Sequence, residues 1–137
     1  MREILFKAKR IDNGEWVEGN IILSNDAEEG WETIIISTAD SNMFVQGNEE
    51  LGFEAWHRVD KDTICQYTGL SDKNGNKIWE NDIVNIVYSN FAGEVCYSDG
   101  YIIKDLRDAC VIGWLDKANE LEVAGNIFDN PELVERN

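Results

Sequence analysis

The sequence predicts a mainly β protein, a small and strongly bent β-barrel or sandwich built from short hairpins, with little helix. Short apolar segments rich in β-branched and aromatic residues are separated by Asn-Gly and Asp-Gly pairs, which favour tight hairpin turns. Proline occurs once, at Pro131, so glycine and Asn/Asp clusters mark the breaks between elements. Several short strands at such close spacing are typical of a small barrel or sandwich.

The first half of the chain is expected to contain strands at residues 3–11, 15–23 and 31–38. The first two flank Asn13-Gly14, and an Asn-Gly pair between apolar segments indicates a hairpin. The third is dense in β-branched residues, which favour strands. Residues 39–55 fit either a loop or a short strand at 43–45.

The second half is expected to contain strands at residues 64–70, 77–79, 83–88, 94–97, 101–103 and 121–128. Asn74-Gly75 and Asp99-Gly100 supply two further hairpin turns. Residues 106–118 match no element clearly. Near the end, Asn130 is expected to cap a short turn of helix that has Pro131 at its first position.

The length of 137 residues fits one domain, 1–137, with an N-terminal β lobe at 1–60 and a barrel-like lobe at 61–137. A hydrophobic content of 43% argues against wholesale disorder. The N-terminus lacks the apolar run of a signal peptide, and no apolar run approaches the roughly 20 residues that span a bilayer. Together with an odd number of cysteines, these features predict a cytoplasmic protein.

The formal charge is −15, from 27 acidic and 12 basic residues. This balance opposes binding to bare nucleic acid and to anionic membranes, because cationic side chains drive both. The stretch between Ile11 and His57 holds eleven acidic residues and no Lys or Arg. It fits a solvated acidic face, or a negative surface that meets a basic partner.

Asp72, Asn74 and Asn76 have the spacing that opens a calcium-binding loop. The pattern then fails, because Lys77 stands where a glycine is needed and Ile83 where a bidentate glutamate should be. A polar hairpin turn explains these residues better than a metal site.

His57 is the sole histidine, and no carboxylate or cysteine lies at a recognised interval from it. A zinc site needs three or four ligands. A Cys–His nucleophilic pair would require the fold to bring Cys65, Cys96 or Cys110 to the imidazole. An ordinary hydrogen-bonded histidine is the simpler interpretation. The sequence therefore assigns no catalytic, cofactor-binding or metal-ligating residue, and it predicts a protein that is not an enzyme and needs no cofactor.

Lys7, Lys9 and Arg10 form the basic cluster of the N-terminal segment. On a strand Lys7 and Lys9 share one face, so they fit a small cationic patch, or a solvated edge where lysines discourage edge-to-edge pairing. Core positions are expected for the five tryptophans, with one or two of them exposed as interface anchors. These tryptophans are Trp16, Trp31, Trp56, Trp79 and Trp114.

Three blocks of the sequence resemble the YopX family of bacteriophage and prophage proteins. They are REILFKA at 2–8, QYTGLSDKNGNKIWENDIV at 66–84 and EVAGNIFDNPEL at 122–133. Asn81 stands where the family usually has glycine; a left-handed backbone there would tolerate asparagine. The resemblance implies a phage or prophage origin in a Gram-positive host and a mostly β fold, and it implies no activity and no catalytic residues.

The central block also has a physical interpretation. Asn74-Gly75 fixes a hairpin, and Glu80 and Asp82 are placed to accept backbone N–H bonds where the next strand begins. The following apolar run, 83–87, is similar at the level of fold to the first strand of SH3-like barrels, so the expected fold is partly SH3-like.

Four functions stay open on this evidence. The first is a non-enzymatic phage accessory protein that binds itself as a homo-oligomer, or binds a host or phage protein, through a β edge or an exposed apolar patch. The alternative is an acidic nucleic-acid mimic that inhibits a host DNA-binding protein, with Glu28, Glu29 and Glu32 as the residues to test. An enzyme would need a deep pocket around His57 or a carboxylate of perturbed pKa. An SH3-like module that binds nucleic acid would shift DNA or RNA in a gel at low salt, where electrostatic binding is strongest.

Overall fold

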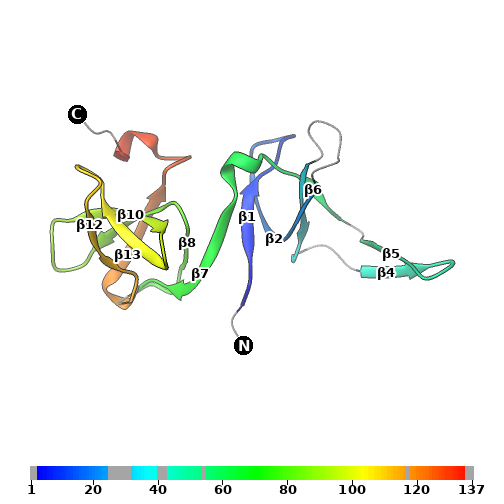
Figure 1. Cartoon of the computed structure of the whole chain (residues 1–137), viewed down its shortest axis with the longest axis horizontal. Helices are drawn as coiled ribbons and strands as arrows, with labels where there is room; N and C mark the ends of the chain where they lie inside the picture. The colour runs from blue at the N-terminus through cyan, green and yellow to red at the C-terminus, as the bar shows by residue number, and fades with distance from the viewer. Residues whose placement is uncertain (1–2, 25–31, 40–42, 54, 117, 135–137) are drawn as a thin grey trace. The chain divides into compact units, whose positions relative to one another are not determined.

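The computed structural model of the chain describes residues 3–24, 32–39, 43–53, 55–116 and 118–134. It contains antiparallel sheets of six, two and five strands, with three short 3-10 turns and no α-helix in these residues (Figure 1). The mainly β prediction is confirmed. The sequence left open a small barrel or a sandwich. The strands of the described residues form open sheets, and no closed barrel is found among them.

The chain divides into two compact units, Glu3–Gln66 and a second that begins at Tyr67. The division of one domain into lobes at residues 60 and 61 stays a prediction. The elements of the first unit are β1 (Phe6–Lys9), β2 (Trp16–Leu23), β3 (Thr33–Ser37), β4 (Met43–Gln46), β5 (Glu50–Phe53), β6 (His57–Arg58), the 3-10 turn η1 (Lys61–Thr63) and the start of β7 (Cys65–Ser71).

Strands β1 and β2 form the predicted hairpin, with Lys9 opposite Trp16 at the end next to the turn. The six-stranded sheet has the order β6-β3-β2-β1-β7-β8, where β8 is Lys77–Trp79, so β1 is an interior strand. The expectation of a solvated edge at Lys7 and Lys9 is therefore wrong, because Cys65 of β7 pairs with Lys7 along that side.

The run Ile34-Ile35-Ile36 gives β3 two apolar faces. Ile35 lies fully buried in the core of the first unit with Ala8 and Val59. Because successive side chains of a strand point to opposite faces, Ile34 and Ile36 belong to the other face of the sheet. A strand with an unbroken apolar run is typical of a sheet that is covered on both sides.

Strands β4 and β5 form a hairpin that pairs with no other strand of the described residues (Figure 1). We call Met43–Phe53 the arm. The short strand expected at 43–45 is confirmed as β4, whereas β5 was not expected from the sequence.

The second unit holds a five-stranded sheet in the order β12-β11-β10-β9-β13. Its elements are the rest of β7, β8 (Lys77–Trp79), β9 (Asp82–Ile86), β10 (Ala92–Tyr97), β11 (Tyr101–Asp105), β12 (Val111–Trp114), the 3-10 turns η2 (Ala118–Glu120) and η3 (Pro131–Val134), and β13 (Leu121–Asn126). The hairpins at Asn74-Gly75 and Asp99-Gly100 are confirmed by the pairing of β7 with β8 and of β10 with β11. β12 lies in the stretch to which the sequence assigned no element.

Buried aliphatic side chains from most strands of the second unit form its core. They are Ile78, Val84, Val95, Ile103, Leu115, Ala118 and Leu121. At the end of the described chain, the side chain of Asn130 accepts a hydrogen bond from Asn126 N at 3.2 Å. The Asn130 side chain therefore faces back toward β13 and does not cap η3 as expected. It lies so close to Gly125 that a Cβ added there would be 2.3 Å from the Oδ1 of Asn130.

Candidate functional site

Asp72 ties the β7–β8 hairpin to β13. It is 6% exposed, and its Oδ1 accepts bonds from Asn74 N and Asn76 N, both at 2.9 Å. Its Oδ2 accepts a bond from Val123 N at 2.9 Å. Burial opposes ionisation of this carboxyl, but the three backbone amides outweigh it and hold the pKa of Asp72 below its ordinary value. The residues that opened the calcium-like pattern thus form a polar turn whose carboxylate is occupied by backbone amides.

Asp82 and Asn81 shape the start of β9. Asp82 is buried, and its Oδ2 accepts a bond from Trp79 N at 2.8 Å, as expected for a carboxylate at this junction. Asn81 has a φ of 73°, the left-handed conformation that explains why glycine is the usual residue there. The central block is therefore a structural element of the second unit.

Metal and nucleophile candidates can be placed as well. In the part of the chain that the structure describes, no three potential ligands among His, Cys, Asp and Glu gather into a metal-binding group. The three cysteines are thiols, with Cys65 buried and Cys110 exposed. The nearby Asp108 carboxylate raises the pKa of the Cys110 thiol, which lowers its thiolate fraction and its reactivity.

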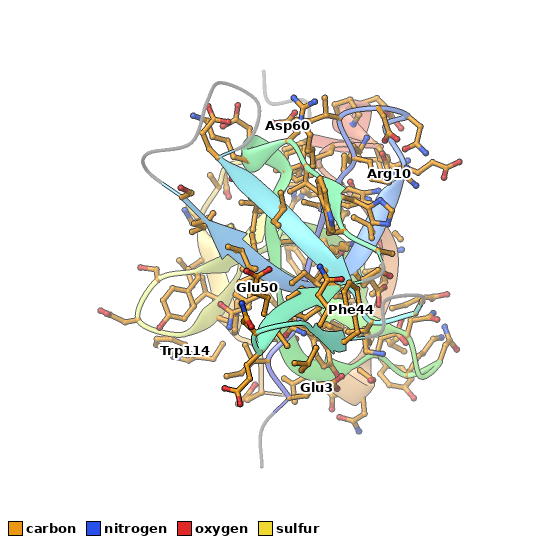
Figure 2. The ribbon with its side chains drawn as sticks, turned by 90° about the vertical axis from the view of Figure 1, so that its right-hand side faces the viewer. Glu3, Arg10, Phe44, Glu50, Asp60 and Trp114 are labelled. Carbon is orange, nitrogen blue, oxygen red and sulfur yellow. The ribbon has the colours of Figure 1, made fainter. Side chains whose placement is uncertain are left out.

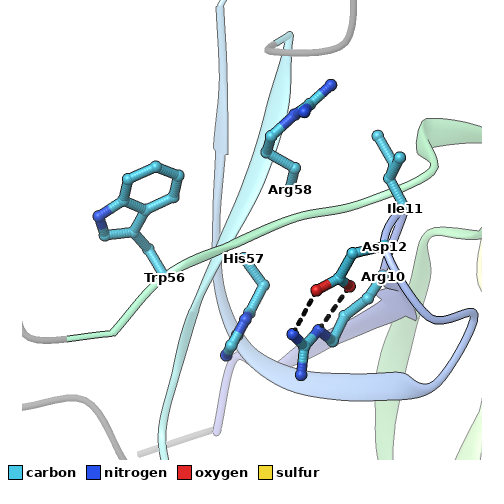
Figure 3. Close-up of a pocket in the computed structure, with 6 residues that line it drawn as sticks. All are labelled: Arg10, Ile11, Asp12, Trp56, His57 and Arg58. Carbon is cyan, nitrogen blue, oxygen red and sulfur yellow. Dashed lines mark hydrogen bonds and ion pairs between the residues drawn. The ribbon is translucent and has the colours of Figure 1, made fainter.

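His57 lines a cavity of about 370 Å³ in the first unit, together with Arg10, Asp12, Trp56 and Arg58 (Figure 3). We call it the His57 pocket. The guanidinium of Arg10 binds Asp12 with two hydrogen bonds, of 2.6 and 3.0 Å, and this pairing holds the pKa of Asp12 below its ordinary value. The lining of the pocket therefore combines the Arg10–Asp12 ion pair with the side chains of Trp56, His57 and Arg58.

The tryptophans divide between core and surface. Trp79 is buried, as expected, and Trp16 is half-buried beneath the ammonium groups of Lys7 and Lys9, which lie 4.6 and 5.4 Å from its ring centroid. Trp56 and Trp114 are the exposed ones, whereas the expectation for Trp31 lies outside the described residues. Both lysines thus share a face, as predicted, and cover an aromatic ring.

The arm exposes the apolar side chains of Val45 and Leu51 on one of its faces. Its register pairs Val45 with Leu51 and Met43 with Phe53, so these four positions belong to one face. Val45 is 65% exposed and Leu51 58% exposed. On the opposite face the Phe44 ring lies over Gly52, where an added Cβ would be 2.6 Å from the ring. Figure 2 shows Phe44 on the arm near its acidic end at Glu50.

A second cavity, of about 420 Å³, lies where the arm leaves the sheet, and its lining is largely apolar. We call it the apolar pocket. Its lining residues are Ile22, Ser24, Ile34, Ile36, Gly52, Phe53 and Trp56. Ile22 and Ile34 are opposite each other in the β2–β3 register, which places them on the face of the sheet away from the core. Ile22 keeps 45% of its surface exposed, so this face is only partly covered.

Trp56 lines both pockets, and the arm supplies a wall of the apolar one. Sequence reasoning singled out Trp56 and His57 but did not join them to Ile22 or Phe53. The one available signal was the run Ile34-Ile35-Ile36, which indicates a sheet covered on both faces. The fold and this surface define a mainly β protein with a partly exposed apolar face in its first unit.

The comparisons with known proteins assign the chain to a family. It matches the YopX protein family over residues 5–135, and it belongs to that family. The crystal structure of protein EF1440 from Enterococcus faecalis is similar, with 27% sequence identity and a TM-score of 0.63 over 98% of this chain and 100% of that chain. No curated protein matches the chain. Family membership assigns no molecular function.

Proposed function

We propose that this protein is a non-enzymatic accessory protein that works by binding protein, including itself, through the apolar surface of its first unit. The observation that supports this most is the arm with its adjoining apolar pocket. A two-stranded hairpin is at best marginally stable in water by itself, and a further packed layer is what stabilises it. Val45 and Leu51 gain such a layer only if another surface covers them.

The test is the mass of the purified protein by light scattering over a range of concentrations, combined with a tagged pull-down from an induced host. An oligomer, or a specific co-purifying protein, supports the proposal. A strict monomer without a partner contradicts it. A gel shift with bare DNA or RNA at low salt should show no complex, because the net charge of −15 opposes one.

The acidic nucleic-acid mimic remains the alternative. It rests on the stretch between Ile11 and His57 that has acids and no Lys or Arg. Glu32 is half-buried beside β3, while Glu28 and Glu29 lie outside the described residues. This alternative predicts a complex with a basic host protein that dissociates at high salt, competes with DNA and is lost on charge reversal of these three residues.

A phage or prophage origin and a cytoplasmic location complete the proposal. Family membership supports the origin, and the thiol state of the cysteines is compatible with a reducing compartment. No helix among the described residues has the length and apolar character to cross a membrane. Fractionation of an induced host would test the location.

A further inference from the structure

We infer that the second unit binds an arginine side chain of another protein, in a small pocket beside the edge strand β12. The pocket measures about 140 Å³ and is lined by residues of β9, β11, β12, η2 and β13. We call it the β12 pocket. All of its lining residues belong to the second unit, so this inference goes beyond the proposed function and does not depend on the arm.

The floor of the β12 pocket is apolar, and its volume suits a single side chain. Ile103 and Leu121 are buried members of the core of the second unit, and Ile86 packs against that core. Sites for drug-sized ligands measure about 300–1,000 Å³, so this cavity is too small for one. Arginine and lysine bury their methylene stems against apolar surface and keep the charged head in water. A long basic side chain therefore matches both the size and the floor of the pocket.

Trp114 forms an aromatic wall of the β12 pocket, and the fold holds it in place. It is 58% exposed. Its ring packs on the β10–β11 turn, where a Cβ added to Gly100 would lie 3.1 Å from the ring atom Cζ3. An exposed indole in a fixed position is suited to bind a cation, because the face of tryptophan attracts guanidinium and ammonium groups more strongly than other aromatic rings do.

Two carboxylates complete the lining of the pocket. Asp116 and Glu120 are exposed, and neither forms an ion pair within the part of the chain that the structure describes. No described lining residue is basic, and Lys117, between them in the chain, lies outside the described residues. These charges attract a cation and repel a phosphate or carboxylate group. A guanidinium fits better than an ammonium, because it stacks on aromatic rings and binds a carboxylate through two parallel hydrogen bonds.

The turn beside the pocket exposes a tyrosine in a strained conformation. Val87 N donates to Glu120 O at 2.8 Å, which fixes this turn between β9 and β10 to η2. Ser89 N donates to Ile86 O at 3.2 Å, so Tyr88 is the third residue of a turn, and its φ of 73° is one that favours glycine there. Tyr88 is 97% exposed and packs on nothing that would offset the strain. Tyrosine, tryptophan and arginine are the residues enriched at binding hot spots, so Tyr88 extends the surface that the partner contacts.

The surface around the pocket indicates that the arginine belongs to a protein. β12 is an edge strand of the five-stranded sheet, and its Val111 and Ile112 are 58% and 39% exposed. A free amino acid in the pocket would leave these side chains and Tyr88 uncovered. A second copy of this chain is disfavoured by the net charge of −15 on each copy. The partner is therefore a different, basic protein.

Titration of the full-length, ¹⁵N-labelled protein with capped peptides at low salt tests this inference. One peptide is acetyl-Gly-Val-Arg-Val-Gly-amide, and the other has citrulline, whose neutral urea group replaces the guanidinium. The arginine peptide should cause saturable shifts at the Trp114 indole N–H and at the Ile112 and Leu121 amides. The citrulline peptide should bind at least roughly tenfold more weakly, because it lacks the cation that the ring and the carboxylates attract. Asp116→Asn/Glu120→Gln should weaken binding of the arginine peptide roughly fivefold or more.

The controls separate the pocket from a general effect of charge. Glu18→Gln/Glu50→Gln removes two exposed charges of the first unit and should leave binding unchanged. Shifts that do not saturate, equal binding of both peptides, or an equal loss in this control would overturn the inference. None of these results would affect the proposed binding through the arm, which belongs to the other unit.

Tyr88→Gly distinguishes a contact residue from a structural one. Glycine relieves the left-handed conformation, so the midpoint of thermal unfolding should rise while binding of the arginine peptide weakens. A structural role for Tyr88 would instead lower the stability together with the binding. A more stable variant that binds as the wild type does would overturn the extension of the contact to this turn.

Discussion

Asp72 offers the sharpest test of how the central block stabilises the second unit. The informative perturbation is Asp72→Asn, which keeps the shape of the side chain and removes its charge. The amide oxygen of asparagine can still accept the bonds from Asn74 N and Asn76 N. Its NH₂ group then faces Val123 N–H, so the bond that joins the hairpin to β13 is replaced by two donors facing each other.

The magnitude follows from that one lost bond. A hydrogen bond to a charged acceptor contributes about 1.5–3 kcal/mol, and leaving a buried donor unsatisfied costs a similar amount. Val123 is half-buried and Asp72 is 6% exposed, so water compensates little. We expect Asp72→Asn to lower the free energy of unfolding by about 2–3 kcal/mol at pH 7.

The effect should depend on pH with a definite sign. The pKa of Asp72 is lowered in the folded state, so its contribution is present above the unfolded value of about 3.9 and is lost as the pH falls through the folded pKa. The difference between wild type and variant should therefore be constant near neutral pH and shrink below about pH 4.

Urea denaturation followed by tryptophan fluorescence, with hydrogen exchange of the Val123 amide, measures both effects. Asp99→Asn is the matched control, because it removes the same charge at an exposed turn whose φ of 54° suits asparagine. It should change stability by less than about 0.5 kcal/mol. An Asp72→Asn variant as stable as that control, or a loss that persists unchanged at pH 2, would refute the reasoning.

Three further predictions follow from single positions. Asn81 has a φ of 73°, which glycine adopts readily and a β-branched residue does not. In thermal unfolding, Asn81→Gly should leave the stability unchanged or slightly raised, and Asn81→Val should lower it by about 1–2 kcal/mol. Equal stability of the two variants would contradict this. Gly19→Ala places a Cβ 2.0 Å from Ile36 O, so it should disrupt the pairing of β2 with β3. The free energy of unfolding should fall by about 3 kcal/mol or more, and the amides of β3 should lose their protection from hydrogen exchange. Retained protection would count against this prediction. Asp108→Asn should lower the pKa of the Cys110 thiol and speed its alkylation at pH 8, whereas an unchanged rate would show that the carboxylate does not act on the thiol.

Local turn chemistry was predictable from the sequence. Asn13-Gly14, Asn74-Gly75 and Asp99-Gly100 each connect the strands expected on either side, because these pairs adopt the backbone conformations that a tight turn requires. Asn81 was likewise expected to be left-handed, and its φ of 73° confirms it. Each of these features depends on residues that are adjacent in the chain.

Features that depend on distant residues were harder to predict. β1 was interpreted as an edge from Lys7 and Lys9, but its second neighbour is β7, more than fifty residues later. β5 combines Glu50 and Gly52 with two apolar residues, a composition with little strand preference, and it forms because its register with β4 pairs Val45 with Leu51. Strand order and register are set by tertiary pairing, which a single sequence does not display.

The candidate site was predictable only in part. One or two tryptophans were expected to be exposed, and Trp56 is exposed and lines both pockets; its role as an interface anchor stays a prediction. The other residues of the apolar pocket come from β2, β3 and β5 and from Ser24, which follows β2, and no spacing rule connects Ile22 with Ile34 or Phe53. Their association follows from the antiparallel register of β2 with β3 and from the place where the arm leaves the sheet.

The central claim is that the exposed apolar side chains of the arm bind another protein surface. Val45→Ser/Leu51→Ser tests it directly, because Val45 is 65% and Leu51 58% exposed and the fold should tolerate the exchange. Light scattering and a pull-down from an induced host compare this variant with the wild type. The account predicts that the wild type forms an oligomer or retains a specific partner and that the folded variant loses it. A folded variant that keeps the same oligomer or partner would contradict the claim.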